Sequence, residues 1–184
     1  MTTQITLQKA PELSVSRWFN TSQPITLEQL RGKVVVIEAF QMLCPGCVSH
    51  GLPQAQQISS LFPKDKVALL GLHTVFEHHA AMTPISLEAF IHEYRLAFPI
   101  GVDEPGISDI PKTMEAYRLR GTPSLVIIDQ NGHLRANHFG NTPDIQIGAE
   151  IATLLSEEAY LLDSQSDSKN NTETCSPEGC QTHL

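Results

Sequence analysis

The sequence has little of what membrane-spanning and nucleic-acid-binding proteins need. No apolar run approaches the roughly 20 residues that cross a bilayer, and the first residues lack the charged and apolar regions of a signal peptide. Lysine and arginine number only 12 against 20 acidic residues, the formal net charge is −8, and no basic run occurs that could follow a phosphate backbone. We therefore expect a cytoplasmic protein that binds neither membranes nor nucleic acids.

Cysteine is also scarce. The chain has 4 cysteines among 184 residues, too few for a disulfide scaffold, and they stand in two pairs, Cys44 with Cys47 and Cys175 with Cys180. In a reducing compartment, a CxxC near alternating strands and helices indicates redox chemistry or metal binding. We conclude that the cysteines are present for chemistry.

The length and the hydrophobic content of 41% suit one packed domain. Residues 163–174 contain no large apolar side chain, so burial cannot offset the entropy cost of ordering them, and we expect a mobile linker there. The predicted organisation is one domain over residues 1–162 and a flexible, disordered polar tail over residues 163–184 that carries Cys175 and Cys180.

Strands and helices alternate along the predicted domain, which indicates an α/β fold. Residues 33–40 and 66–72 are continuous apolar runs, typical of central strands that are covered on both faces. Apolar residues at helical spacing predict helices at residues 45–61, 86–98 and 111–119 and after Thr142.

An antiparallel hairpin is predicted near the end of the domain. Residues 123–129 and 133–139 have the composition of strands, and Asn131-Gly132 between them suits a type I′ turn. The hairpin would add two antiparallel strands to the sheet.

A CPGC tetrapeptide, Cys44 to Cys47, directly follows the first predicted strand and begins the first predicted helix. The unpaired N–H groups and the dipole at a helix N-terminus stabilise negative charge, which favours the thiolate form of Cys44. Cys47 lies one turn later and within reach, so a mixed disulfide on Cys44 can be resolved inside the same protein. The motif predicts a redox centre with Cys44 as nucleophile and Cys47 as resolving cysteine.

Three phrases of the sequence carry a family resemblance: APEL near the start, LEQLRGKVVVIEAF before CPGC, and GTPSLVIIDQNGHLR after it. Over residues 10–160 the chain resembles the thioredoxin-like superfamily, and within it the TlpA, ResA and DipZ-like branch of thiol-disulfide oxidoreductases. The resemblance implies a thioredoxin-like fold with a central mixed sheet and an inserted strand-helix region between the CPGC helix and the hairpin. It also implies exchange with a disulfide-bearing protein or a small-thiol substrate, a thiol electron donor, and neither an organic cofactor nor a metal.

The resemblance assigns roles to three residues outside CPGC. In this family the proline at Pro123 is cis and, with Thr122, presents a backbone edge on which a substrate docks. The acid at Glu38 is buried, which raises a carboxyl pKa, and it exchanges protons with the inner cysteine. The chain departs from the family pattern at Leu43, where tryptophan is common, and at Pro53, which comes one residue late and predicts a local bulge in the helix.

Three alternatives stay open. A peroxiredoxin-like thiol peroxidase would use Cys47 with Arg120 as its cationic partner, although Cys44 stands where that family has a threonine. A copper- or zinc-binding carrier would hold its metal with the CPGC thiolates, but the sequence offers no clear third ligand. The tail pair Cys175 and Cys180 is a candidate redox relay, since a flexible chain of that length spans roughly 20 Å.

Overall fold

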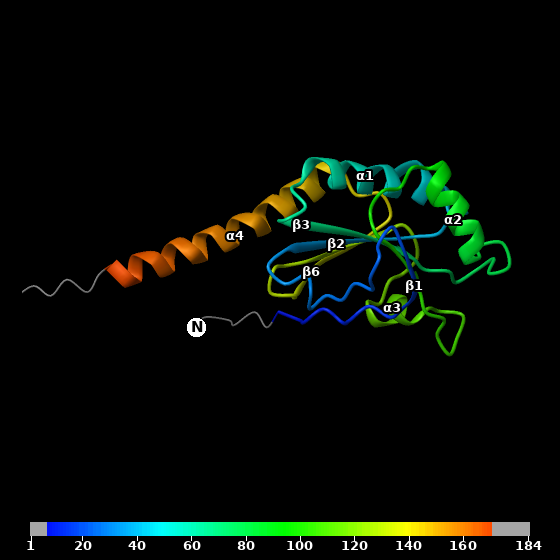
Figure 1. The fold of residues 1–184 in the computed structure, drawn as a ribbon, viewed down its shortest axis with the longest axis horizontal. Coiled ribbons are helices and arrows are strands. Elements are labelled where there is room, and N and C mark those ends of the chain that lie inside the picture. The colour runs from blue at the N-terminus through cyan, green and yellow to red at the C-terminus, as the bar shows by residue number, and fades with distance from the viewer. Residues whose placement is uncertain (1–6, 171–184) are drawn as a thin grey trace, which may run out of the picture.

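Six strands form one mixed sheet in the computed structural model, which describes residues 7–170 and their side chains as far as residue 157 (Figure 1). The strands are β1 (Val15–Phe19), β2 (Val34–Phe40), β3 (Val67–His73), β4 (Ile100–Asp103), β5 (Ser124–Ile128) and β6 (Leu134–Phe139). Their order is β1-β4-β3-β2-β5-β6, with β2, β3 and β4 parallel to one another and the other pairings antiparallel. The predicted central mixed sheet is confirmed.

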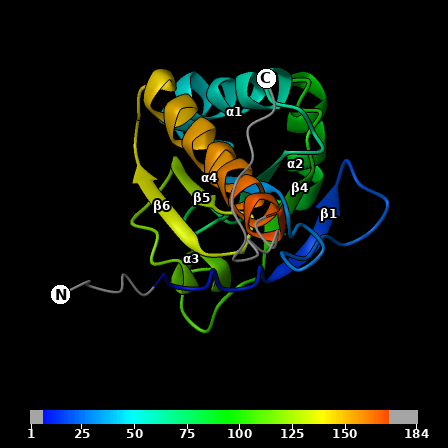
Figure 2. The same cartoon turned by 90° about the vertical axis from the view of Figure 1, so that its left-hand side faces the viewer.

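Helices cover both faces of this sheet. They are the turn η1 (Cys47–Gly51) and the helices α1 (Leu52–Leu61), α2 (Pro84–Glu93), α3 (Lys112–Ala116) and α4 (Asp144–Asn170). The helices α1, α2 and α4 contribute to the core on one face, and α3 lies on the other (Figures 1 and 2). The segment from β3 to α3 lies between α1 and the hairpin β5–β6, as the resemblance implies for an inserted strand-helix region.

Strand β2 positions the site because it lies near the centre of the sheet and ends just before CPGC. All seven of its residues are buried. Side chains alternate between the two faces of a strand, so Val36 and Phe40 lie in the core on the α1 side, whereas Ile37 and Ala39 lie in the core on the α3 side. Glu38 shares the face of Val36 and Phe40 and therefore points toward the helix that carries the cysteines.

The helix that follows CPGC contains one widened turn. In η1 the N–H of Leu52 donates to the carbonyl of Cys47, five residues back, which is the hydrogen bond of a π-helix. Pro53 follows at once and has no N–H to donate, and it lies in the first turn of α1, which begins at Leu52 directly after the widened turn. The bulge predicted from the late proline is confirmed.

The sequence patterns predict neither β1 nor β4. β4 has only four residues, and β1 is an edge strand with two exposed residues and a register shift between Val15 and Arg17. Short strands and edge strands are determined by pairing with their neighbours, and their own hydrophobic pattern is weak. The helix α2 also begins and ends earlier than predicted, because Thr83 caps its first turn and Arg95 adopts a left-handed φ of 52°.

The turn of the β5–β6 hairpin differs from the predicted type I′. That type needs positive φ at two successive residues, but Gly132 has φ of 79° and Asn131 is absent from the residues with positive φ. The carboxylate of Asp129 accepts the N–H groups of Asn131 and His133 at 3.0 and 2.8 Å. This side chain organises a longer loop, so the Asn-Gly pair does not make a two-residue turn by itself.

Helix α4 continues to Asn170, past the boundary predicted at residue 162. Residues 149–170 include neither glycine nor proline, and an established helix extends at little cost per residue. The tail cysteines, Cys175 and Cys180, lie outside the described residues. No helix of the described part of the chain is both long enough and apolar enough to span a membrane.

Candidate active site

The two cysteines of CPGC differ sharply in exposure. Cys44 lies four residues after the end of β2 and is half-buried, whereas Cys47 begins η1 and is completely buried. The amide N–H of Cys47 donates to the sulfur of Cys44 at 3.2 Å, and the Cys44 thiol donates to the carbonyl of Thr122 at 3.4 Å. Both cysteines are free thiols in the structure, and an incoming molecule can reach only the outer one.

The Thr122-Pro123 peptide bond lies beside this pair and is cis, as predicted. Pro123 is buried against the cysteine turn. A β-carbon at Gly46, inside the CPGC motif, would lie 3.2 Å from Cδ of Pro123. The carbonyl of Thr122 already accepts a hydrogen bond from Cys44, so the backbone edge before Pro123 faces the outer sulfur.

Glu38 is buried as predicted, with 1% of its surface exposed. Its Oε1 atom has no hydrogen-bond partner among the described residues. Burial raises the pKa of the Glu38 carboxyl well above its usual value, and the charge of Cys44 raises it further. The structure therefore holds a carboxyl that favours its neutral form while Cys44 carries negative charge.

Cys47 also holds its proton tightly. Its pKa is raised to about 12, first by burial and then by its hydrogen bond with the Cys44 sulfur. Hydrogen bonds from the backbone N–H of Gln41 and from the side chain of Thr122 lower the pKa of Cys47. The sulfur of Cys47 thus has two hydrogen-bond donors that stabilise its thiolate form, and Cys44 is the neighbour that raises its pKa.

Gln41 is a residue of the site that sequence reasoning missed. Its side chain is buried, its Nε2 atom lies 3.5 Å from the Thr122 hydroxyl, and its Oε1 atom has no partner among the described residues. Its carbonyl also accepts the N–H of Cys44 at 3.2 Å. The signal in the sequence is a polar side chain directly between an apolar strand and the cysteine motif.

Residues proposed for the alternative activities lie elsewhere or are not brought together. The guanidinium of Arg120 lies over the ring of Phe139, 5.1 Å from its centre, and the side chain is exposed. Within the described ranges, no three His, Cys, Asp or Glu side chains gather as they would around a metal ion. His73 is buried beside Phe40, and burial lowers its pKa to about 4.

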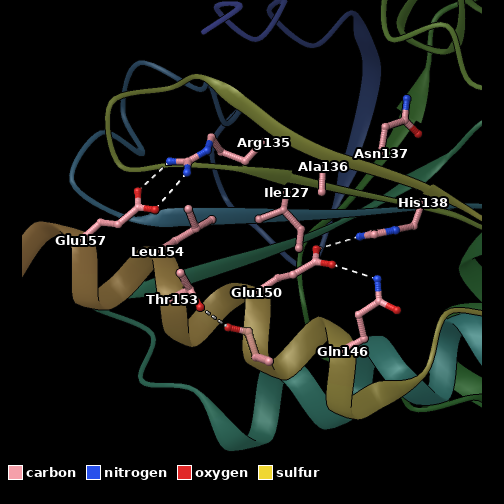
Figure 3. A pocket seen from close by; sticks show the side chains of 11 residues that line it. Ile127, Arg135, Ala136, Asn137, His138, Gln146, Glu150, Thr153, Leu154 and Glu157 are labelled. Atoms are coloured by element: carbon pink, nitrogen blue, oxygen red, sulfur yellow. Dashed lines mark hydrogen bonds and ion pairs between the residues drawn. The ribbon is translucent and has the colours of Figure 1, made fainter. Parts of the chain in front are cut away.

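A cavity of about 550 Å³ lies between β6 and α4, and Figure 3 shows its lining. Arg135 bonds to both carboxylate oxygens of Glu157 at 2.7 and 3.0 Å, and His138 bonds to Glu150 at 2.7 Å (Figure 3). None of the predicted site residues lines this cavity. Its charged side chains pair with one another, so they tie α4 to the hairpin.

Comparison with known proteins gives three kinds of similarity. A protein-family model described as the AhpC/TSA family matches residues 6–137. The thiol-disulfide oxidoreductase ResA of Halalkalibacterium halodurans is 25% identical over 137 residues, which are 74% of this chain and 70% of ResA. The protein DipZ of Mycobacterium bovis is 29% identical over 134 residues, which are 71% of this chain but only 18% of DipZ.

Solved structures agree in fold. A crystal structure of a thioredoxin-like superfamily protein superposes with a TM-score of 0.80 at 66% identity and covers 80% of this chain and 96% of its own. A thiol-disulfide isomerase from Corynebacterium glutamicum gives a TM-score of 0.77 at 49% identity and covers 80% of this chain and 97% of its own. The predicted thioredoxin-like fold is confirmed.

Proposed function

Since the chain belongs to the AhpC/TSA family and has a thioredoxin-like fold, we propose that it is a thiol-disulfide oxidoreductase that works through Cys44 and Cys47. One observation carries the proposal: the reachable sulfur of Cys44 accepts the N–H of the fully buried Cys47 at 3.2 Å, beside the cis Thr122-Pro123 edge. Such a pair can form and break one internal disulfide while a partner gains or loses two electrons. The substrates we propose are disulfide-bearing proteins or small thiols, with a second thiol as electron donor.

In the first step, the Cys44 thiolate attacks one sulfur of the partner disulfide. A bond forms between Cys44 and that sulfur, the partner's own S–S bond breaks, and the other partner sulfur leaves as a thiolate that takes a proton from water. The N–H of Cys47, which already donates to the Cys44 sulfur at 3.2 Å, stabilises the attacking charge. The backbone edge of Thr122 and Pro123 holds the partner chain in this step.

In the second step, Cys47 attacks Cys44, which releases the partner as a thiol and leaves a Cys44–Cys47 disulfide. Cys47 must first lose its proton, and we assign that proton to Glu38. Negative charge on Cys44 raises the pKa of both Glu38 and Cys47, after the larger contribution of burial. Once Cys44 is bonded to the partner this charge is gone, so formation of the mixed disulfide itself prepares Glu38 and Cys47 for the second step.

The similar proteins support this activity over the alternatives. ResA is named as a thiol-disulfide oxidoreductase and the Corynebacterium protein as a thiol-disulfide isomerase. A peroxidase would need Arg120 near a reachable Cys47, whereas Arg120 lies over Phe139 and Cys47 is completely buried. A cytoplasmic location and a relay through Cys175 and Cys180 stay predictions of the sequence.

The direct test compares two substrates of the unmodified protein. We expect it to accelerate the reduction of insulin by dithiothreitol by at least about a thousandfold over the uncatalysed reaction, since it supplies a positioned nucleophile and a general base. With hydrogen peroxide and the same donor we expect no acceleration. Rapid peroxide turnover without insulin reduction would instead favour the peroxidase.

Replacing Glu38 by glutamine tests the proton transfer. We expect Glu38→Gln to slow the second step about 100-fold near neutral pH, because removal of a general base typically costs at least that much. The rate of the variant should then rise with pH, since Cys47 must lose its proton directly to solvent, so the difference from wild type narrows in alkaline solution. Stopped-flow measurement of the second step across pH checks this, and equal rates at neutral pH would contradict the assignment.

The pH dependence of folding stability gives a second test of the Glu38→Gln variant. Because the folded-state pKa of Glu38 is raised, its contribution to stability is fully present below the unfolded value of about 4.3 and is lost as pH rises through the folded value. Wild type should therefore lose stability with rising pH over a range where Glu38→Gln does not. Denaturant unfolding of both proteins at several pH values measures the difference.

A further inference from the structure

Gly51 is the last residue of η1, and its backbone conformation does not require glycine. Its φ of −58° and ψ of −52° are those of an ordinary α-helix, which every residue except proline adopts with ease. Glycine inside a helix is less stable than alanine, so it is costly at this position. The residue is also buried. The reason for a glycine here must therefore be sought in the space around it.

That space is filled by Glu38. A β-carbon built on Gly51 would lie 2.2 Å from Oε1 and 3.2 Å from Cδ of Glu38, and 2.9 Å from Cβ of Pro123. Real β-carbons do not come so close to other atoms, so any side chain at position 51 would displace the carboxyl or Pro123. The carboxyl that lies in this space is the one whose Oε1 is buried without a hydrogen-bond partner among the described residues.

The widened turn links this space to the inner cysteine. η1 begins at Cys47 and ends at Gly51, and the N–H of Leu52, directly after it, bonds back to the carbonyl of Cys47. The carboxyl of Glu38 therefore lies against the same turn that carries Cys47, and Pro123 also lies close to Gly51. Because Glu38 is on a central strand with all seven residues buried, its backbone has little freedom to retreat.

We propose that Gly51 is a positioning residue for the second step: the missing side chain leaves the space in which Glu38 lies ready to accept the proton of Cys47. The inference rests on the proposed function. In the step concerned, the proton of Cys47 passes to Glu38, the S–S bond between Cys47 and Cys44 forms, and the bond from Cys44 to the partner breaks. The partner sulfur takes the electron pair of that bond and then a proton, so the partner is reduced and the cysteine pair oxidised.

The test separates the two steps in one reaction trace. A symmetric nitrobenzoate disulfide releases one coloured thiolate when Cys44 attacks and a second when Cys47 closes the internal disulfide. The full chain carries Cys175→Ser and Cys180→Ser, so that only the CPGC thiols react. We expect Gly51→Ala to slow the second release at least about tenfold, since a misplaced catalytic group costs up to about 100-fold, and to leave the first release within about twofold.

Gly148→Ala is the matched control for an added methyl group in a helix. Gly148 lies in α4, and a β-carbon there would meet no atom within 4 Å. We expect this variant to release both thiolates at the wild-type rates and to melt at the same or a higher temperature. Gly51→Ala should melt at a lower temperature, the opposite of the usual effect of alanine in a helix.

The deciding measurement is a double-mutant cycle with Glu38→Ala, which removes the carboxyl and opens the space. In that background Gly51→Ala should change the second release less than about twofold. The same tenfold loss in both backgrounds would overturn the proposal, because the methyl would then act through Pro123 or the turn.

If Gly51→Ala alone does not fold, folding of the double variant supports the proposal and failure of both overturns it. Failure of the proposed function is distinct, because the wild-type protein would then show no second release at all.

Discussion

Cys44→Ser is expected to abolish insulin reduction by dithiothreitol, with a loss of at least about a thousandfold to the uncatalysed rate. Removal of a catalytic nucleophile typically leaves only the background reaction, and a serine hydroxyl does not ionise near neutral pH as a thiol does. The described part of the chain offers no substitute, because Cys47 is completely buried, and burial, the first cause of its raised pKa, does not depend on Cys44. An insulin turbidity assay measures the effect.

The control for the Cys44→Ser result is a variant that replaces the two cysteines of the tail, Cys175 and Cys180. A variant with Cys175→Ser and Cys180→Ser keeps both CPGC thiols, so it should still carry out the first step at the wild-type rate. If the predicted relay operates, its turnover with a thiol donor should fall while that first step is unchanged. Cys44→Ser with wild-type activity would rule out Cys44 as the nucleophile and, with it, the proposed mechanism.

Cys47→Ser is expected to stop the reaction halfway. The outer thiol remains and attacks the partner, but nothing releases the adduct, so the protein should accumulate as a mixed disulfide with its substrate. Serine is close to cysteine in size, and the N–H of Gln41 and the hydroxyl of Thr122 that bond to the sulfur of Cys47 can bond to an oxygen in the same place. We therefore expect a folded protein whose turnover at limiting reductant falls at least about a thousandfold.

Intact mass spectrometry with a disulfide-bonded peptide measures this trapping. Cys47→Ser should gain the mass of one peptide half, and an excess of dithiothreitol should remove it. With Cys175→Ser and Cys180→Ser introduced into both proteins, Cys44→Ser under the same conditions should gain no mass, because Cys47, its remaining thiol, is out of reach. Adduct formation on Cys44→Ser, or unchanged turnover of Cys47→Ser, would show that the roles of the two cysteines are assigned the wrong way round.

These expectations share one electrostatic cause. The charge on Cys44 is a contribution, after burial, to the raised pKa of both Glu38 and Cys47. While Cys44 is a thiolate, the inner groups keep their protons and Cys47 does not compete for the substrate. Covalent capture of the partner removes that charge, so the order of the two steps follows from the position of one sulfur.

Much of the fold could be predicted because the central elements have strong local patterns. Seven successive buried residues of β2 appear in the sequence as an uninterrupted valine-rich run, and the late Pro53 predicts the bulge seen at η1. The edge strand β1 and the short inner strand β4 could not be found in this way, since their pairing is set by neighbours distant in sequence. The hairpin turn was likewise decided by the carboxylate of Asp129, which lies outside the Asn-Gly pair.

The sequence alone indicated the cysteine pair and its place between strand and helix, because motif spacing is a local property, and the family resemblance supplied Glu38 as the candidate proton acceptor. Only the tertiary structure decided which sulfur can be reached, that Gln41 joins the site, and that Gly51 makes room for a carboxyl. Those facts depend on contacts between residues far apart in sequence or on opposite elements, such as Thr122 with Cys44 and Gly51 with Glu38. The physical reason is that exposure and free space are properties of packed atoms, which the order of residues specifies only through the fold.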